Sequence, residues 1–263
     1  MSISMQHPAN VPVLNGIHHV TAIASDPQAN IDFYTGVLGL RLVKLTVNFD
    51  SPNVYHFYYG DGAGSPGTIL TFFPFPNAAR GRQGTGMVSI VGLAIAPSSL
   101  GYWIDRLLEG NIAYEGPTVR GEERVISFRD PDGLALELVT DPNAVLQAPW
   151  ERSSVPVEHQ IRGVANVALW EQDAEPTTRF MTEQLGFEPI GEVGEAVRYR
   201  VGEGIGAADV RAVGGFWSGS VSAGTVHHVA WSTPDDAAQA AWLERLDSVV
   251  PGLTSVQDRQ YFH

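Results

Sequence analysis

The chain repeats itself at a spacing of 147 residues. Residues 16–22 (GIHHVTA) resemble residues 163–169 (GVANVAL), and the same spacing relates Phe33 to Phe180 in segments that both end in Leu-Gly. Two matches in one register, with no gap between them, indicate that one structural unit occurs twice. The fold is therefore expected to be an assembly of similar units.

Each half divides again into two units that open with a short apolar strand followed by an amphipathic helix. In the first unit, residues 16–23 are rich in Val, Ile and Thr, which favour strands. Asp26 and Pro27 are a typical helix start, as N-cap and first helical residue, and Gly39 ends the helix. Further strands are expected at residues 40–49, 54–59 and 68–73, which gives the order β-α-β-β-β.

The remaining units follow the same plan. Trp103 and Trp242 lie in matching helices 139 residues apart, so Arg124 corresponds to His263, the last residue. We therefore expect the chain to end inside its fourth unit. The second unit is expected to have a strand at 88–96, a helix at 98–109 and strands at 124–128 and 134–140; the third covers 161–220, and the fourth starts at Thr225, with a helix near 235–249.

These units predict an α+β fold made of four tandem βαβββ modules, of which the last is incomplete. Prolines at positions 142, 149 and 156 mark the boundary between the halves. The predicted organisation is an N-terminal domain of two modules at residues 1–145, a linker at 146–160, and a C-terminal domain at 161–263 with the third module and a truncated fourth.

Composition and charge narrow the function classes. Acidic residues outnumber basic ones 29 to 16, so the surface repels phosphate backbones and nucleic-acid binding is not expected. No stretch is long and apolar enough to cross a bilayer, and no secretory signal is recognised, so a cytoplasmic protein is expected. The chain has no cysteine, which excludes disulfides, thiolate metal sites and cysteine nucleophiles. Any metal must bind through His, Asp or Glu.

Two histidine doublets, His18-His19 and His227-His228, lie in the first strands of the first and fourth modules. The other two modules lack them, so the fold itself does not demand them. Neighbouring strand residues point to opposite faces, so one member of each doublet can line a shared cavity. Imidazole binds Fe(II), and two histidines with one carboxylate leave positions for substrate and oxygen. The alternative is two ordinary pairs of core or edge histidines. Glu137 is interpreted as a paired surface carboxylate rather than a vestigial ligand.

Several motifs resemble one known family. The histidine in the first strand, the helix ending Phe33-Tyr34-x-x-x-Leu38-Gly39 and the four βαβββ modules are similar to the vicinal oxygen chelate superfamily. That family includes glyoxalase I, bleomycin-binding proteins and extradiol ring-cleaving dioxygenases. The doublets and the segments 55–61 (YHFYYGD), 64–68 (GSPGT) and 258–262 (DRQYF) resemble ring-cleaving dioxygenases of the hydroquinone 1,2-dioxygenase type.

The resemblance implies a site and an architecture. It implies that modules one and four share one cup-shaped mixed sheet and that modules two and three share another. The third metal ligand of the family, a Glu on the last strand of the fourth module, is expected beyond residue 263. The residues that match the family's site are His19 and His228 as metal ligands, His18, His227 and Tyr261 as catalytic residues, and Thr21 and Arg259 as substrate-binding residues.

The activity implied by the resemblance is that of an extradiol-type ring-cleaving dioxygenase. Such an enzyme uses Fe(II), with Mn(II) as the alternative ion, to insert O₂ into a hydroquinone- or catechol-type aromatic. Phe57 and Trp231 are candidates for an aromatic cavity wall, or are plain core. Two alternatives share the fold: a glyoxalase-type lyase or isomerase, and a protein that binds an aromatic ligand without turnover. The expected partners are a small aromatic substrate and O₂, without nucleic acid or membrane, and a homo-oligomer is left open.

Overall fold

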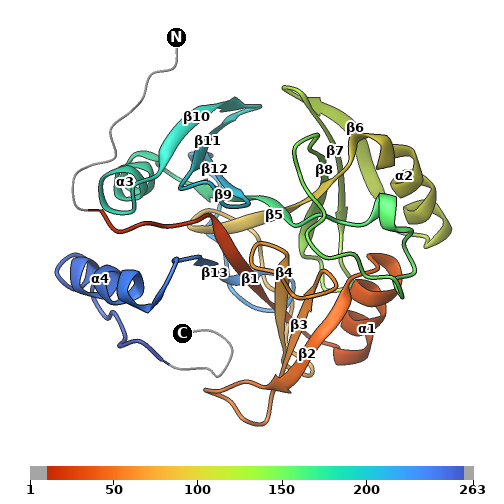
Figure 1. Ribbon diagram of the computed structural model, residues 1–263, viewed down its shortest axis with the longest axis horizontal. Coiled ribbons are helices and arrows are strands. Elements are labelled where there is room, and N and C mark those ends of the chain that lie inside the picture. The colour runs from red at the N-terminus through yellow and green to blue at the C-terminus, as the bar shows by residue number, and fades with distance from the viewer. Residues whose placement is uncertain (1–10, 258–263) are drawn as a thin grey trace.

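Two curled mixed β-sheets organise the computed structural model, which describes residues 11–257 (Figure 1). The first sheet has the strand order β13-β1-β4-β3-β2 and the second has the order β10-β11-β12-β9-β5-β8-β7-β6. The strands of the first sheet are β1 (Ile17–Ala24), β2 (Arg41–Val47), β3 (Tyr55–Gly60), β4 (Ile69–Pro74) and β13 (Val226–Trp231).

The second sheet contains the strands of the second and third modules. They are β5 (Met87–Ile95), β6 (Tyr114–Arg120), β7 (Glu123–Arg129), β8 (Ala135–Thr140), β9 (Val164–Glu171), β10 (Glu188–Val193), β11 (Ala196–Arg200) and β12 (Ala207–Ala212). The prediction that modules one and four share one sheet, and modules two and three the other, is confirmed. Each sheet therefore draws strands from both halves of the chain, and the predicted domain boundaries stay a prediction.

Helices precede the long strand hairpins, as the module plan predicts. Asp26 caps α1 (Pro27–Ile31), because its carboxylate accepts hydrogen bonds from the backbone N–H groups of Gln28 and Ala29. The α-helices that follow are α2 (Leu100–Glu109), α3 (Glu175–Arg179) and α4 (Asp236–Asp247), and short 3₁₀ turns lie at η2 (Pro97–Ser99) and η3 (Val157–His159). No helix among residues 11–257 is long and apolar enough to span a membrane.

Two details differ from the sequence-based expectations. The first helix continues as a π-helix at η1 (Asp32–Val37), and its copy in the third module does the same at η4 (Phe180–Gln184). Apolar spacing predicts a helix over these residues but does not specify whether its backbone hydrogen bonds follow the α or the π pattern. The βαβββ plan implies a strand after the second helix, but the sequence did not locate β6, because five of its seven residues are exposed and it lacks the apolar alternation of a half-buried strand.

The repeated glycine that opens each half has a structural cause. Gly16 has a φ of +76°, and a Cβ atom there would lie 2.4 Å from the carbonyl oxygen of Ile205. Gly163, its counterpart, has a φ of +135°, and a Cβ atom there would lie 2.9 Å from the oxygen of Gly67. Both positions combine a left-handed backbone with close backbone contact, which only glycine accepts. The glycines therefore allow the first strand of each half to pass close to a loop of the other half.

Candidate metal and substrate site

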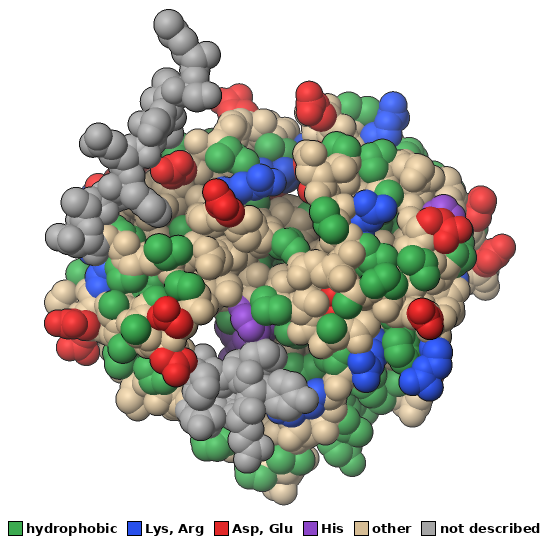
Figure 2. Space-filling model, viewed as in Figure 1, with side chains coloured by type: hydrophobic (Ala, Val, Ile, Leu, Met, Phe, Trp, Pro, Cys, Tyr) green, Lys and Arg blue, Asp and Glu red, His purple; other side chains and the backbone are tan. Residues whose placement is uncertain are grey.

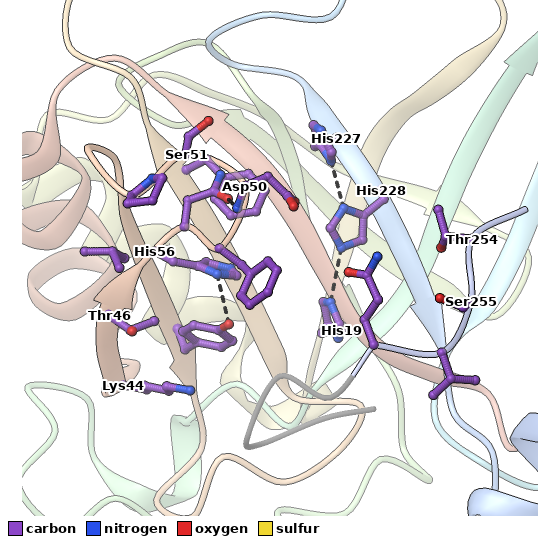
Figure 3. Close-up of a pocket in the computed structure, with 18 of the residues that line it drawn as sticks. His19, Lys44, Thr46, Asp50, Ser51, His56, His227, His228, Thr254 and Ser255 are labelled. Carbon is purple, nitrogen blue, oxygen red and sulfur yellow. Dashed lines mark hydrogen bonds between the residues drawn. The ribbon is translucent and has the colours of Figure 1, made fainter. Parts of the chain in front are cut away.

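The pairing of β1 with β13 brings the two histidine doublets together. Thr21 lies opposite His228 in this antiparallel register, and the Nε2 atoms of His19 and His228 are 3.3 Å apart although the residues are 209 positions apart in the chain. Figure 3 shows these two rings pointing toward each other from adjacent strands. The structure thus joins the two residues predicted to bind metal.

The geometry of this histidine pair fits a divalent ion. Imidazole nitrogens bind such ions at about 2.0–2.1 Å, so two ligands of one ion lie about 3.0–3.4 Å apart. The observed 3.3 Å separation of the Nε2 atoms falls within that range. Metal binding also requires neutral imidazole, which the surroundings of both rings favour.

The surroundings lower both pKa values. Burial, and then the nearby charges of His228, His18 and His56, hold the pKa of His19 well below its usual 6.5. The ring of His228 is open to the cavity but closely surrounded by protein atoms; this desolvation, followed by the charge of His227, lowers its pKa to about 4. Both imidazoles are therefore neutral at neutral pH, with a lone pair available on one nitrogen of each ring.

The first member of each doublet, His18 or His227, orients the second, which is the candidate metal ligand. The Nδ1 atoms of His227 and His228 are 2.8 Å apart, and those of His18 and His19 are 2.9 Å apart. If Nε2 binds a metal, the proton of each ligand ring is on Nδ1 and is donated to its neighbour's Nδ1. Such an outer hydrogen bond fixes the tautomer and the ring orientation that metal binding needs.

A cavity of about 1000 Å³ opens in front of the histidine pair, large enough for a substituted aromatic ring. Figure 2 shows histidine side chains in a hollow of the surface. The side chains that line the cavity include the aromatic residues Phe49, Tyr58, Phe73, Phe75 and Trp242, the histidines His19, His56, His227 and His228, and the charged residues Lys44 and Asp50.

The other predicted site residues differ in their position relative to the cavity. His227 lines the cavity, whereas His18 and Thr21 are not among its lining residues. Thr21 has 0 % of its surface exposed, and its hydroxyl contacts His228 and Thr71, so it supports the site from beneath. Arg259 and Tyr261 lie outside the described residues, and their roles stay predictions, as does the Glu expected after residue 263.

The first sheet also contributes cavity residues that the sequence motifs did not assign to the site. His56 and Tyr58 of β3 and Lys44 of β2 line the cavity. Figure 3 shows His56 and Lys44 on the side opposite the histidine pair. The alternation of His56 and Tyr58 in a strand was a usable signal, because residues two apart share a face. Phe57 and Trp231, in contrast, are absent from the cavity lining: Phe57 is 1 % exposed, and the Trp231 ring packs edge-on against Phe187.

The second cup contains ion pairs at the matching positions. Asn166 occupies the place of His19, and its amide donates to Asp209, which also binds Arg198 with two hydrogen bonds of 2.6 and 2.8 Å. Glu137 pairs with Arg120 at 2.9 Å. The expectation that Glu137 is a surface carboxylate is wrong, because it is only 7 % exposed and this pairing lies inside the cup. Guanidinium groups therefore neutralise the carboxylates of this cup.

Residues 11–257 do not place an acidic third ligand beside His19 and His228. Among residues 11–257, no group of three or more His, Asp or Glu side chains converges in a way that could hold a metal. The described site therefore consists of two imidazoles that face one point in the cavity. Thr21 lies below them, 3.0 Å from the Nε2 atom of His228.

Known proteins are similar to this chain in sequence. The chain is 40% identical over 248 residues to "Putative ring-cleaving dioxygenase MhqO" of Bacillus subtilis (strain 168), covering 94% of this chain and 79% of that protein. It is 32% identical over 267 residues to the chlorohydroquinone/hydroquinone 1,2-dioxygenase of Sphingobium indicum, covering 98% of this chain and 81% of that protein.

Solved structures agree with the architecture. A crystal structure from Bacillus subtilis subsp. subtilis str. 168, described as a "putative dioxygenase", matches with a TM-score of 0.86 and 39% identity, over 94% of this chain and 79% of that one. Glyoxalase I from Zea mays has the same fold, with a TM-score of 0.63 and 16% identity over 90% of this chain and 85% of that one. Residues 16–138 also match the family model for the Glyoxalase/Bleomycin resistance protein/Dioxygenase superfamily. On this agreement of sequence and fold, the chain belongs to that superfamily.

Proposed function

We propose that the protein is a metal-dependent ring-cleaving dioxygenase that inserts O₂ into a hydroquinone- or catechol-type aromatic. The observation that carries the proposal is the pair of neutral imidazoles, His19 and His228, whose Nε2 atoms converge in a cavity with aromatic walls. Sequence relatives named as ring-cleaving and hydroquinone dioxygenases support the same activity.

The residues present suit a divalent ion, and we propose Fe(II), with Mn(II) as the alternative. When bound, such an ion supplies a Lewis acid and a template that brings a ring oxygen and O₂ together. His19 and His228 would hold it through Nε2, oriented by their Nδ1 contacts to His18 and His227. The predicted third ligand, a Glu after residue 263, would complete the set.

The chain's own side chains then handle the substrate. His227 lines the cavity beside His228 and is the candidate to move a proton to or from the ring oxygen or the opening ring. Phe73 and Phe75 are apolar walls that would exclude water from the flat faces of the ring. Tyr261 and Arg259 are proposed to hydrogen-bond the substrate and to hold its anionic oxygen.

Oxygen consumption tests the proposal directly. The protein, loaded with Fe(II) under anaerobic conditions, is mixed with hydroquinone and O₂ in an oxygen electrode. We expect one O₂ consumed per hydroquinone, with both oxygen atoms in a ring-opened product by mass spectrometry. His228→Ala should abolish the reaction. His159→Gln is the matched control, because His159 stacks on Tyr102 away from the cavity.

Two outcomes would contradict the proposal. Isomerisation of the hemithioacetal of methylglyoxal and glutathione without oxygen uptake would favour the lyase alternative. Hydroquinone binding by the Fe(II)-loaded protein without oxygen uptake would favour the ligand-binding alternative. The lyases of this fold usually add two carboxylates to their histidines, and among the described residues no such group surrounds His19 and His228.

A further inference from the structure

One row of side chains crosses the whole first sheet. The strand registers place His228 opposite Thr21, Thr21 beside Thr71, Thr71 opposite Tyr58, and Tyr58 opposite Lys44. Residues in one row across a sheet share a face, so this row runs from the histidine pair to the opposite wall of the cavity. The row connects the candidate metal site with Tyr58 and Lys44, to which no role has been assigned so far.

Hydrogen bonds follow this row, with His56 added between Thr71 and Tyr58. The His228 Nε2 atom is 3.0 Å from the Thr21 hydroxyl, which is 2.7 Å from the Thr71 hydroxyl. The Thr71 hydroxyl is 2.9 Å from Nε2 of His56, whose Nδ1 is 2.9 Å from the Tyr58 hydroxyl. Four hydrogen bonds therefore link a metal-ligand candidate to a tyrosine that lines the cavity.

Burial restricts where the protons in this chain can go. Thr21 and Thr71 are both 0 % exposed, so neither hydroxyl can turn to solvent or to a molecule in the cavity. Each hydroxyl has a single proton to donate. Within residues 11–257, the two hydroxyls make hydrogen-bond contacts with each other and with the rings of His228 and His56. The direction of one bond therefore determines the direction of the next.

A metal ion at the histidine pair sets that direction. When Nε2 of His228 binds the ion, it has no lone pair left to accept the Thr21 proton. Thr21 must then donate to Thr71, and Thr71 must donate to Nε2 of His56. His56 consequently has its proton on Nδ1 and donates it to the Tyr58 oxygen. The Tyr58 hydroxyl then accepts from His56 and keeps its own proton as a donor, and Tyr58 is among the residues that line the cavity.

We propose that Tyr58 is a substrate-binding residue that donates a hydrogen bond to the second oxygen of the aromatic ring, and that Thr21, Thr71 and His56 position its proton once metal is bound. The inference rests on the proposed function, because it assigns a binding partner within that same cavity. Thr21, Thr71 and His56 are positioning residues, since they act through Tyr58. Lys44, the only lysine of the chain, places its ammonium 5.3 Å from the centre of the Tyr58 ring and favours an electron-rich acceptor there.

The position of Tyr58 selects among ring diols. Tyr58 is on β3 and His228 is on β13, three strands apart in the sheet order, or roughly 14 Å along the sheet at ~4.8 Å per strand. The curled sheet places them on different walls of the cavity. A ring bound through one oxygen at the histidine pair directs its para oxygen away from that pair, whereas an ortho oxygen stays beside the first. Tyr58 therefore favours a 1,4-diol over a 1,2-diol.

The first measurement is the tautomer of His56. The protein labelled with ¹⁵N-histidine is loaded with Zn(II), a diamagnetic substitute, and the imidazole ¹⁵N shifts are recorded with and without metal. We expect the Nδ1–H form of His56 in the loaded protein. Thr71→Val should remove this fixed tautomer, and Thr71→Ser, which restores the hydroxyl, should regain it. A loaded protein whose His56 has its proton on Nε2 would overturn the positioning role.

The second measurement is ligand selectivity in the same Zn(II)-loaded protein. The Kd of hydroquinone should be about tenfold lower than that of phenol, the gain expected for one hydrogen bond. Tyr58→Phe should bring the two Kd values together, and Thr71→Val should reduce the difference. Tyr55→Phe is the matched control, because Tyr55 lies in the same strand, is 53 % exposed and is not among the residues lining the cavity.

The outcomes separate the two proposals. If the unaltered protein turns over hydroquinone with Fe(II) but Tyr58→Phe retains the preference for hydroquinone over phenol, the inference about Tyr58 is wrong and the dioxygenase proposal stands. If the unaltered protein holds neither Zn(II) nor Fe(II), or binds no aromatic ring when loaded, the proposed function is wrong and the inference falls with it.

Discussion

Replacing Asp130 with Asn should remove a pH dependence that is built into the fold. Asp130 lies in the turn between β7 and β8 and is 6 % exposed. Its carboxylate accepts backbone hydrogen bonds from Asp132 at 2.9 Å and Leu134 at 2.8 Å, and a hydroxyl hydrogen bond from Tyr34 at 3.1 Å. Burial, opposed in part by these hydrogen bonds and reinforced by the charge of Asp132, raises the pKa of Asp130 from 3.8 to about 6.

The sign and size of the effect follow from that pKa. The folded state binds the Asp130 proton more tightly than the unfolded state, so folding is favoured below about pH 4, and this contribution is lost as the pH rises through about 6. A shift of about two pKa units corresponds to roughly 3 kcal/mol at 1.36 kcal/mol per unit. Asparagine keeps an oxygen that can accept the two backbone hydrogen bonds and carries no charge to bury.

Urea unfolding from pH 4 to pH 8 measures this difference. We expect the free energy of unfolding of Asp130→Asn, minus that of the unaltered protein, to increase as the pH rises. The increase should reach up to about 3 kcal/mol, with most of it between about pH 4 and pH 6. Asp105→Asn, at an exposed carboxylate of α2, controls for the loss of one negative charge. A difference between Asp130→Asn and the unaltered protein that stays constant with pH would refute the reasoning.

Three further predictions concern the two cups. His228→Ala should weaken Fe(II) or Zn(II) binding by more than about a hundredfold in a titration, and an unchanged affinity would exclude His228 as a ligand. Because desolvation lowers the pKa of His228 to about 4, Zn(II) binding should persist at pH 5.5 and weaken only as the pH falls toward 4; a loss centred near 6.5 would contradict this. Arg198→Met leaves Asp209 as a buried charge without its guanidinium partner, so it should lower the free energy of unfolding by about 3–5 kcal/mol without changing metal affinity at His19 and His228.

The sequence predicts the module plan because local patterns carry it. Asp26 and Pro27 indicate the start of α1 from their own chemistry, and the structure confirms the Asp26 cap. The repeated glycines at 16 and 163 were visible as a pattern, while their cause, contact with loops of the other half of the chain, depends on the tertiary structure. Strand β6 was missed because its exposed residues lack an alternating pattern.

Some features of the candidate site were also visible in the sequence, and others depend on the tertiary structure. The histidine doublets indicated a metal site from residue type and from their absence in the other modules. Their 3.3 Å convergence follows from the pairing of β1 with β13, which a sequence pattern does not specify. Thr71 was not recognised, because a buried threonine resembles an ordinary core residue until the register places it in one row with Tyr58.

What the sequence determined by itself is the repeated βαβββ module and the residue types available for chemistry. Hydrophobic spacing, capping residues and glycines act over a few residues, so they are readable along the chain. Only the tertiary structure decided which modules share a sheet and which side chains face each other across it. It also decided that arginines pair with the carboxylates of the second sheet. These contacts join residues far apart in the sequence, and their energies depend on burial and register, which exist only after the sheets have formed.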